Sequence, residues 1–146
     1  MSGSGSVTAP LTSERGAWAA KHLETDLVGW LTTVAPDGRV QSSAVAFFWD
    51  GATILLYSQP DTPKLRNIAA NPRVSFALNT DVYGDHVLIL EGTAAVDGTT
   101  PAWDANEAFS AKFRDAVVHW GGTDDQALVR SFSVAVRITP TRIRAW

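Results

Sequence analysis

A serine, a threonine and a lysine lie close together in the segment SQPDTPKLRN, residues 58–67. Thr62 suits the N-cap of a helix, and Pro63 suits its first position, where a missing N–H has no cost. Lys64 then falls in the first turn, although the positive end of a helix favours anions. One interpretation is that Lys64 is solvated. The other is that Lys64, the hydroxyl groups of Ser58 and Thr62 and the free N–H groups of the first turn bind an anion.

Small polar side chains interrupt an otherwise apolar predicted strand at QSSAV, residues 41–45. Such residues are typical of a strand that faces solvent at the edge of a sheet. They would equally suit a wall on which a flat ring lies, with Gln41, Ser42 and Ser43 supplying hydrogen bonds. The pattern alone leaves both interpretations open.

The three histidines, His22, His86 and His119, lie on different predicted elements and lack the spacing of metal ligands. We therefore expect no metal site. His86 opens a long predicted strand, where a lone histidine is either structural or a proton donor. The sequence contains no nucleophile motif, phosphate-binding loop or paired carboxylates, so any catalysis would belong to a bound cofactor.

Bulk composition excludes several classes of protein. The 146 residues, 45% of them hydrophobic, suit one domain with a core, and the absence of cysteine excludes disulfides. A formal charge of -3 without a basic block argues against a nucleic-acid partner. No apolar run approaches the length of a membrane helix, and MSGSGSVTAP lacks the features of a signal peptide. We expect a flexible tail over residues 1–12, no membrane partner and a cytoplasmic location.

The hydrophobic patterns predict at least six antiparallel strands, with helices at the corners. We expect strands at residues 27–35, 40–50, 52–58, 73–79, 85–96 and 131–139, the first three forming a meander. We expect helices at residues 14–23, 62–70 and 103–120, and one more helical turn capped by Thr123. This order indicates a mostly β protein, a small β-barrel with flanking helices that forms a single domain over residues 13–146.

Two stretches together resemble a known superfamily. They are LTTVAPDGRVQSSAVAFFWDGATILLYSQPDTPKLRNIAANPRVSFAL, followed by GDHVLILEGTAAV. Their ordered strands, Asp-Gly turns, T-x-K-x-x-N helix and N-P-R-V-S strand resemble the pyridoxamine 5'-phosphate oxidase-like superfamily. The details are most similar to the actinobacterial deazaflavin (coenzyme F-420)-dependent oxidoreductases of the B group. The resemblance implies an FMN-binding-like split β-barrel that forms a homodimer, with two cofactors at the subunit interface.

The resemblance also implies a set of site residues. The cofactor phosphate falls at the start of the helix after the third strand, near Thr62 and Lys64. The cofactor ring falls along residues 41–45, and the segment near Asp85 and His86 reaches that ring from the other subunit. The implied cofactor-binding residues are Gln41, Ser42, Ser43, Ala44, Val45, Ser58, Thr62, Pro63, Lys64, Asn67 and His86. His86 is also the one candidate for a catalytic proton donor.

The sequence departs from the oxidases of this superfamily that use FMN. Those enzymes have an arginine where Ser43 aligns, a lysine near Phe48, and an Arg-Lys pair where this chain has Pro63 and Lys64. Each lost charged contact to a phosphate costs roughly 1.5–3 kcal/mol, or about a hundredfold in affinity. We therefore do not expect pyridoxamine 5'-phosphate oxidase activity.

The function that the resemblance implies is an F-420-dependent reductase that transfers a hydride to a small unsaturated organic substrate. The acidic tail of F-420 would meet Arg39, Arg66 or the C-terminal Arg137, Arg142 and Arg144. Three alternatives stay open. The first is an FMN-binding flavoprotein oxidoreductase, the second is a non-catalytic flavin or haem carrier, and the third is an interaction dimer without cofactor.

Overall fold

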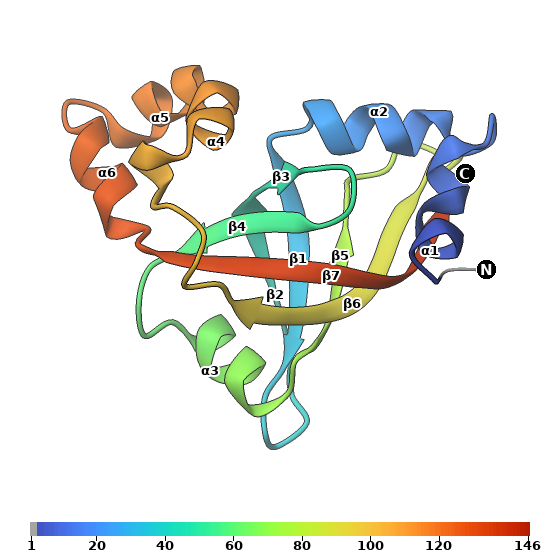
Figure 1. Ribbon diagram of the computed structural model, residues 1–146, viewed down its shortest axis with the longest axis horizontal. Coiled ribbons are helices and arrows are strands. Elements are labelled where there is room, and N and C mark those ends of the chain that lie inside the picture. Colours follow the sequence, from blue (N-terminus) through green and yellow to red (C-terminus); the bar gives the residue numbers. More distant parts are fainter. Residues whose placement is uncertain (1–2) are drawn as a thin grey trace.

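Seven antiparallel strands form one sheet, in the order β2-β1-β5-β6-β7-β4-β3. The structure, a computed structural model, describes residues 3–146. The strands are β1 (Val28–Val34), β2 (Val40–Ala46), β3 (Phe48–Trp49), β4 (Ile54–Ser58), β5 (Arg73–Ala77), β6 (Leu88–Val96) and β7 (Val134–Ala145). The sheet curls into a half-barrel with helices around it (Figure 1). The expected mostly β, split-barrel fold is confirmed.

The predicted meander of the first three strands is wrong. The segment expected as one strand divides at Phe47: β2 pairs with β1, whereas β3 pairs with β4. Phe47 is fully buried, and its N–H donates to the Leu27 carbonyl at 3.2 Å. The chain therefore leaves one end of the sheet and joins the other end, which is how the sheet curls.

Two groups of buried side chains fill the molecule. The larger group lies inside the curled sheet and includes Phe47, Phe76 and Leu90. The smaller group is mostly aromatic. It joins the outside of β4 to the helical segment that precedes β7, through Tyr57, Trp103 and other rings. The helical segment is therefore fixed to the barrel by its own core.

The N-terminal segment differs from the expected flexible tail. Residues Gly3–Thr12 form helix α1, and Val7 and Leu11 pack against the core because they are four residues apart on one helical face. Residues 1 and 2 of that expected tail lie outside the described residues. Helix α2 (Ala17–Thr25) begins three residues later than Glu14. Ser13 caps the turn before it, where its side chain accepts a hydrogen bond from Gly16 N at 3.1 Å.

The long helix predicted at residues 103–120 is broken into shorter pieces. These are η1 (Trp103–Ala105), α4 (Glu107–Lys112) and α5 (Arg114–Gly121), followed by α6 (Asp125–Ser131). Asn106 starts a new helix because its side chain accepts a hydrogen bond from Phe109 N at 3.2 Å. Asp124, not Thr123, caps α6 by accepting from Ala127 N at 2.9 Å. None of the helices in the described part of the chain is long and apolar enough to cross a membrane.

Lys112 joins helix α4 to the barrel. Its Nζ donates to the Phe47 carbonyl at 2.7 Å and lies 4.1 Å from the centre of the Phe47 ring. Burial at this place lowers the pKa of Lys112 to about 8, although the nearby Asp26 carboxylate acts in the opposite direction. The charged form of this side chain is therefore disfavoured by folding.

We expect the stabilising contribution of Lys112 to rise with pH. In the unfolded chain a lysine keeps its proton up to about pH 10.4, so above about pH 8 the unfolded state binds more protons than the folded state. The free energy of unfolding should therefore increase between these two values. Urea denaturation across this range measures the increase, which Lys112→Met should reduce and Lys21→Met, at an exposed lysine, should keep. An unchanged pH slope in Lys112→Met would contradict the assignment.

Candidate functional site

A mostly apolar cavity of about 310 Å³ lies between the edge strand β2, helix α3 (Pro63–Ala70) and the helical segment η1–α6. Lys64 is the one charged residue of its lining. The lining residues are Val28, Ala44, Val45, Ala46, Tyr57, Lys64, Trp103, Trp120, Leu128 and Phe132. The structure thus brings together the apolar part of the predicted ring wall, Ala44 and Val45, and the predicted anion-binding lysine.

The Lys64 ammonium group has no hydrogen-bond or ion-pair partner among residues 3–146. The side chain is half-buried, and this burial lowers its pKa. Removing an ammonium from water without a partner is costly, and a nearby anion offsets that cost. The surroundings of Lys64 therefore favour the second of the two interpretations of its position, an anion-binding residue.

The start of helix α3 offers fewer donors than the sequence suggests. The helix begins after Thr62 as predicted, but the Thr62 side chain makes no capping hydrogen bond. Its hydroxyl lies 3.1 Å from Ser58 Oγ, which itself donates to the Gln59 carbonyl at 2.7 Å. Leu65 N donates to the Thr62 carbonyl at 3.1 Å. Because Pro63 has no N–H, only the N–H of Lys64 stays available to a ligand in this turn.

A second cavity of about 580 Å³ lies on the other side of helix α3, against the β1–β2 turn. Gln41, Pro63 and Asn67 line it, together with two arginines, Arg39 and Arg66. Arg39 pairs with Asp37 at 2.8 Å, and Arg66 donates to the Asp61 carbonyl at 2.7 Å, yet both arginine side chains are exposed. Two fixed cations therefore face this cavity near the start of α3.

Asn67 connects helix α3 to the sheet. It is buried, and its Nδ2 donates to Thr33 Oγ1 at 3.0 Å and to Gln41 Oε1 at 3.2 Å. The structure thus brings these two predicted site residues together, and Asn67 orients the Gln41 side chain toward the cavity.

Strand β2 carries the predicted ring wall at the edge of the sheet. Its only neighbour is β1, where Ser42 Oγ lies 2.7 Å from Thr32 Oγ1. Ser42 and Ala44 are on the exposed face, whereas Val45 points into the core. Both interpretations of the QSSAV segment therefore apply to parts of it: the strand is an exposed edge, and Ala44 and Val45 line a cavity.

His86 does not line either cavity within one chain. It is exposed, and its ring stacks on Trp18 of α2 with the ring centres 5.5 Å apart. His22 stacks on the same indole at 4.3 Å, and its Nδ1 lies 2.8 Å from Asp26 Oδ1. A role for His86 at the cavity thus requires a second subunit.

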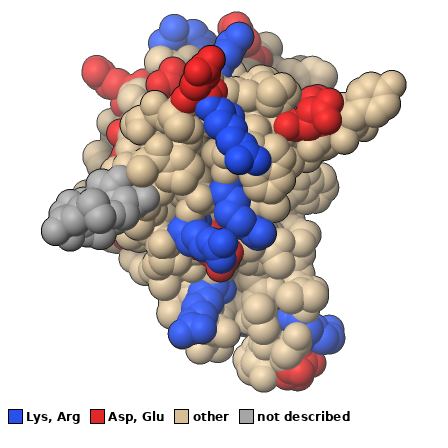
Figure 2. Space-filling view, turned by 90° about the vertical axis from the view of Figure 1, so that its right-hand side faces the viewer, with Lys and Arg blue, Asp and Glu red and all other residues tan. Residues whose placement is uncertain are grey.

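The three C-terminal arginines do not form one site. Arg137 bonds to Asp97 at 3.0 Å and to Asp50 at 3.3 Å, so it fixes two loops. Arg142 and Arg144 lie near the far end of β7, opposite Glu91 and Ile89 of β6. Figure 2 shows Lys and Arg side chains in a column on this side of the molecule. Arg144 pairs with Glu91 at 3.9 Å, so Arg142 is the one of the three without an ion pair among the described residues.

Sequence reasoning missed the aromatic half of the cavity lining. Trp103 and Trp120 fall in the predicted helix 103–120, where the spacing indicates only a packed helical face, and Phe132 falls in the predicted strand 131–139. In the folded chain Trp120 stays 42% exposed, which the sequence does not show. The described residues contain no group of three or more His, Asp or Glu side chains placed to hold a metal ion.

Comparisons with known proteins give the chain a family. The family model for pyridoxamine 5'-phosphate oxidase matches residues 18–146. Rv2991, a conserved hypothetical protein from Mycobacterium tuberculosis, is 26% identical over 92% of this chain and 84% of its own, with a TM-score of 0.69. A protein described as an F420 reductase is 27% identical over 85% of this chain and 94% of its own, with a TM-score of 0.65.

The fold also occurs in a protein with a different description. HutZ, the haem storage protein from Vibrio cholerae, is 16% identical over 90% of this chain and 94% of its own, with a TM-score of 0.62. Because an F420 reductase and a haem storage protein share this fold, the fold alone does not identify a ligand. The residues that line the cavities are the relevant evidence.

Proposed function

Because the chain belongs to the pyridoxamine 5'-phosphate oxidase family, we propose that it binds a flavin-type cofactor, and specifically the deazaflavin coenzyme F-420. In this proposal it is a reductase that acts on a small unsaturated organic molecule. The observation that carries the proposal is Lys64, an unpaired ammonium group at the rim of an apolar cavity beside β2. A flat ring with an attached phosphate fits both parts of that environment.

The two arginines of the neighbouring cavity favour F-420 over FMN. Arg39 and Arg66 lie beyond the start of α3, on the side away from the apolar cavity. A ligand whose phosphate meets Lys64 could extend past Pro63 and reach them. F-420 carries an acidic glutamate tail that needs such cations, whereas FMN ends at its phosphate. In the proposal, the ring, the phosphate and the tail therefore occupy successive parts of one surface.

The residues of this chain bind and orient the proposed cofactor, and no acid side chain is required. When bound, the reduced deazaflavin supplies a hydride to one carbon of the substrate double bond, and water supplies the proton to the other carbon. The aromatic walls, Trp103, Trp120 and Phe132, exclude bulk water around the ring. The Tyr57 hydroxyl does not serve as a proton donor to the substrate, because it donates to the Pro101 carbonyl at 2.6 Å and accepts from Asn106 Nδ2 at 3.1 Å.

A homodimer is part of the proposal. The register of β1 and β2 puts Val28, Trp30 and Val40 on one sheet face, and they are 37%, 45% and 71% exposed. Val82 and Tyr83, at the turn before β6, are 93% and 87% exposed. Apolar surface of this extent favours burial against a second copy of the chain. Such a copy would also bring His86, three residues after Tyr83, toward a neighbouring cavity.

We expect replacing Val82 and Tyr83 by serine to weaken this dimer. The double variant loses the most exposed apolar side chains of the described chain, so its association should weaken at least about tenfold. Sedimentation equilibrium measures the dissociation constant, with Val118→Ser as the control, since Val118 is 58% exposed on helix α5. A protein that is monomeric throughout, or a double variant that dimerises as tightly as Val118→Ser, would refute the proposed interface.

The arginine assignment predicts a difference between two ligands. Arg39→Gln and Arg66→Gln should each weaken F-420 binding about tenfold and leave FMN binding unchanged, because only F-420 has the acidic tail. Fluorescence titration with each cofactor measures both affinities, and Arg73→Gln, an exposed arginine on β5, is the control. Tighter binding of FMN than of F-420 would instead make the chain an FMN flavoprotein. Binding of haem alone would make it a carrier.

A further inference from the structure

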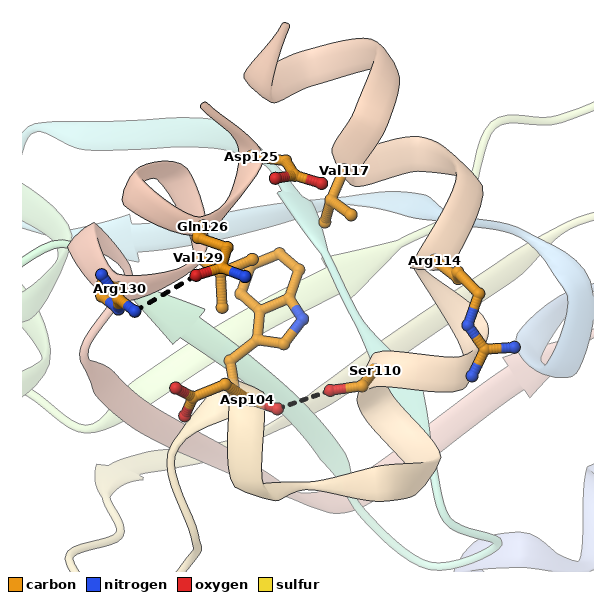
Figure 3. A pocket seen from close by; sticks show the side chains of 9 residues that line it. Asp104, Ser110, Arg114, Val117, Asp125, Gln126, Val129 and Arg130 are labelled. Carbon is orange, nitrogen blue, oxygen red and sulfur yellow. Dashed lines mark hydrogen bonds between the residues drawn. The ribbon is translucent and has the colours of Figure 1, made fainter. Parts of the chain in front are cut away.

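A third cavity, of about 320 Å³, lies within the helical segment, between η1, α4, α5 and α6 (Figure 3). It is distinct from the two cavities beside α3. Its apolar part consists of Trp103, Val117 and Val129, and Ser110 on α4 adds a hydroxyl that donates to the Trp103 carbonyl at 2.7 Å. Nothing in the proposed cofactor site uses this space.

Charges of both signs surround the apolar part of this cavity. The two carboxylates belong to Asp104 and Asp125, and the two guanidinium groups to Arg114 and Arg130. In Figure 3 the two arginines lie on opposite sides of the cavity, and the two aspartates lie toward its upper and lower ends. Arg130 donates to Gln126 Oε1 at 3.2 Å.

These opposite charges do not neutralise one another. No ion pair within 4.0 Å joins any two of them in the described structure. Elsewhere the chain does pair its charges, as where Arg137 meets both Asp50 and Asp97. A cavity that holds carboxylates and guanidinium groups apart around an apolar surface is complementary to a ligand that carries both charges.

We propose that this cavity binds a small zwitterion with an apolar body, of the class of an apolar amino acid or a dipeptide. The ligand ammonium meets Asp125, and its carboxylate meets Arg114. Its apolar side chain covers Val117 and Val129. A ligand with a single charge leaves one set of protein charges unused, so both charges of the ligand contribute to selectivity.

The position of the cavity couples it to the apolar cavity beside β2. Trp103 lines both cavities. Helix α5 contributes Val117 to the third cavity and Trp120 to the apolar cavity beside β2, and residues of α6 also line both cavities. A ligand that contacts α5 and α6 in the third cavity therefore also restrains helices that line the apolar cavity beside β2. Binding in one cavity is thus linked to binding in the other.

Isothermal titration calorimetry of the full chain tests the proposal with four probes. L-leucine and L-leucyl-L-leucine carry both charges, whereas N-acetyl-L-leucine and L-leucinamide carry one each. We expect one of the two zwitterions to bind at least about tenfold more tightly than either singly charged probe. Arg114→Gln and Asp125→Asn should each weaken that binding about tenfold, and Arg15→Gln, at an exposed arginine outside the cavity, should not.

Three results would overturn the proposal. They are no heat of binding from either zwitterion up to about 10 mM, equal binding of the singly charged probes, and binding indifferent to both substitutions. Circular dichroism checks the fold of each variant. If one variant does not fold, the other variant and the four probes still decide, because they test opposite charges of the same cavity.

Discussion

Lys64→Met is expected to lower the affinity for F-420 by roughly ten- to a hundredfold, because a charged hydrogen bond to a phosphate contributes about 1.5–3 kcal/mol. Methionine keeps the length and apolar character of the lysine stem, so the cavity wall beside Ala44 and Val45 stays intact. Fluorescence titration of wild type and variant with oxidised F-420 measures the change. A deazaflavin that lacks the phosphate and the tail should bind both proteins equally.

The same substitution should not destabilise the free protein. Lys64 is half-buried without a partner, and burial lowers its pKa, so its charge is a cost of folding in the absence of ligand. The thermal midpoint of Lys64→Met should therefore equal or exceed that of wild type, with Lys21→Met as the matched exposed control. Unchanged F-420 affinity in a folded Lys64→Met would remove Lys64 from the site.

Gly92→Ala is expected to destabilise the sheet strongly, because the added methyl group would meet backbone atoms rather than a movable side chain. Gly92 lies at the bulge where β6 pairs with Pro140 of β7. A Cβ atom at this position would lie 2.4 Å from the Thr139 carbonyl oxygen and 3.2 Å from the Pro140 Cα, both of which are backbone atoms. Because no side chain can rotate away, the two strands must separate.

We expect this substitution to lower the free energy of unfolding by about 3 kcal/mol and the thermal midpoint by about 10 °C. Gly98→Ala is the control, since a Cβ atom there meets nothing within 4 Å and the glycine needs no left-handed backbone. Thermal and urea denaturation measure both variants. Equal stability of the two variants would show that the close approach of β6 and β7 does not determine the fold.

The parts of the fold that the sequence predicted correctly are those set by short-range signals. Helix α3 begins after Thr62, as the proline and the apolar spacing indicate, and the Asp-Gly turns at Gly38 and Gly51 have positive φ. Pairing between distant strands carries no such local signal. Nothing in the segment around Phe47 marks the break, because apolar strand residues lie on both sides of it.

The prediction of one long helix at residues 103–120 was wrong for a related reason. The apolar stripe continues through residues 103–120, so the periodicity predicts one helix, but Asn106 begins a second helix and Phe113 separates α4 from α5. An asparagine inside an amphipathic pattern can either continue a helix or cap a new one. The tertiary contacts of Phe109 and Trp103 decide between these, and a single sequence does not contain them.

The candidate site was partly visible in the sequence. The sequence alone indicates Lys64, because a cation is unfavourable in the first turn of a helix. Its unpaired state and its position beside Ala44 depend on how α3 lies against β2, and only the folded chain shows them. The charged cavity around Arg114 and Asp125 depends in the same way on the breaks between the helices.

The most direct test of the proposed site is the pKa of Lys64 with and without F-420, measured by NMR of the lysine side chains. The chain has three lysines, Lys21, Lys64 and Lys112, so Lys64→Met and Lys112→Met assign all the signals. We predict that the pKa of Lys64 lies below the ordinary value in the free protein and rises when F-420 binds, because the phosphate stabilises the ammonium form. A Lys64 pKa that F-420 at saturation leaves unchanged, or failure of F-420 to bind, would contradict this account.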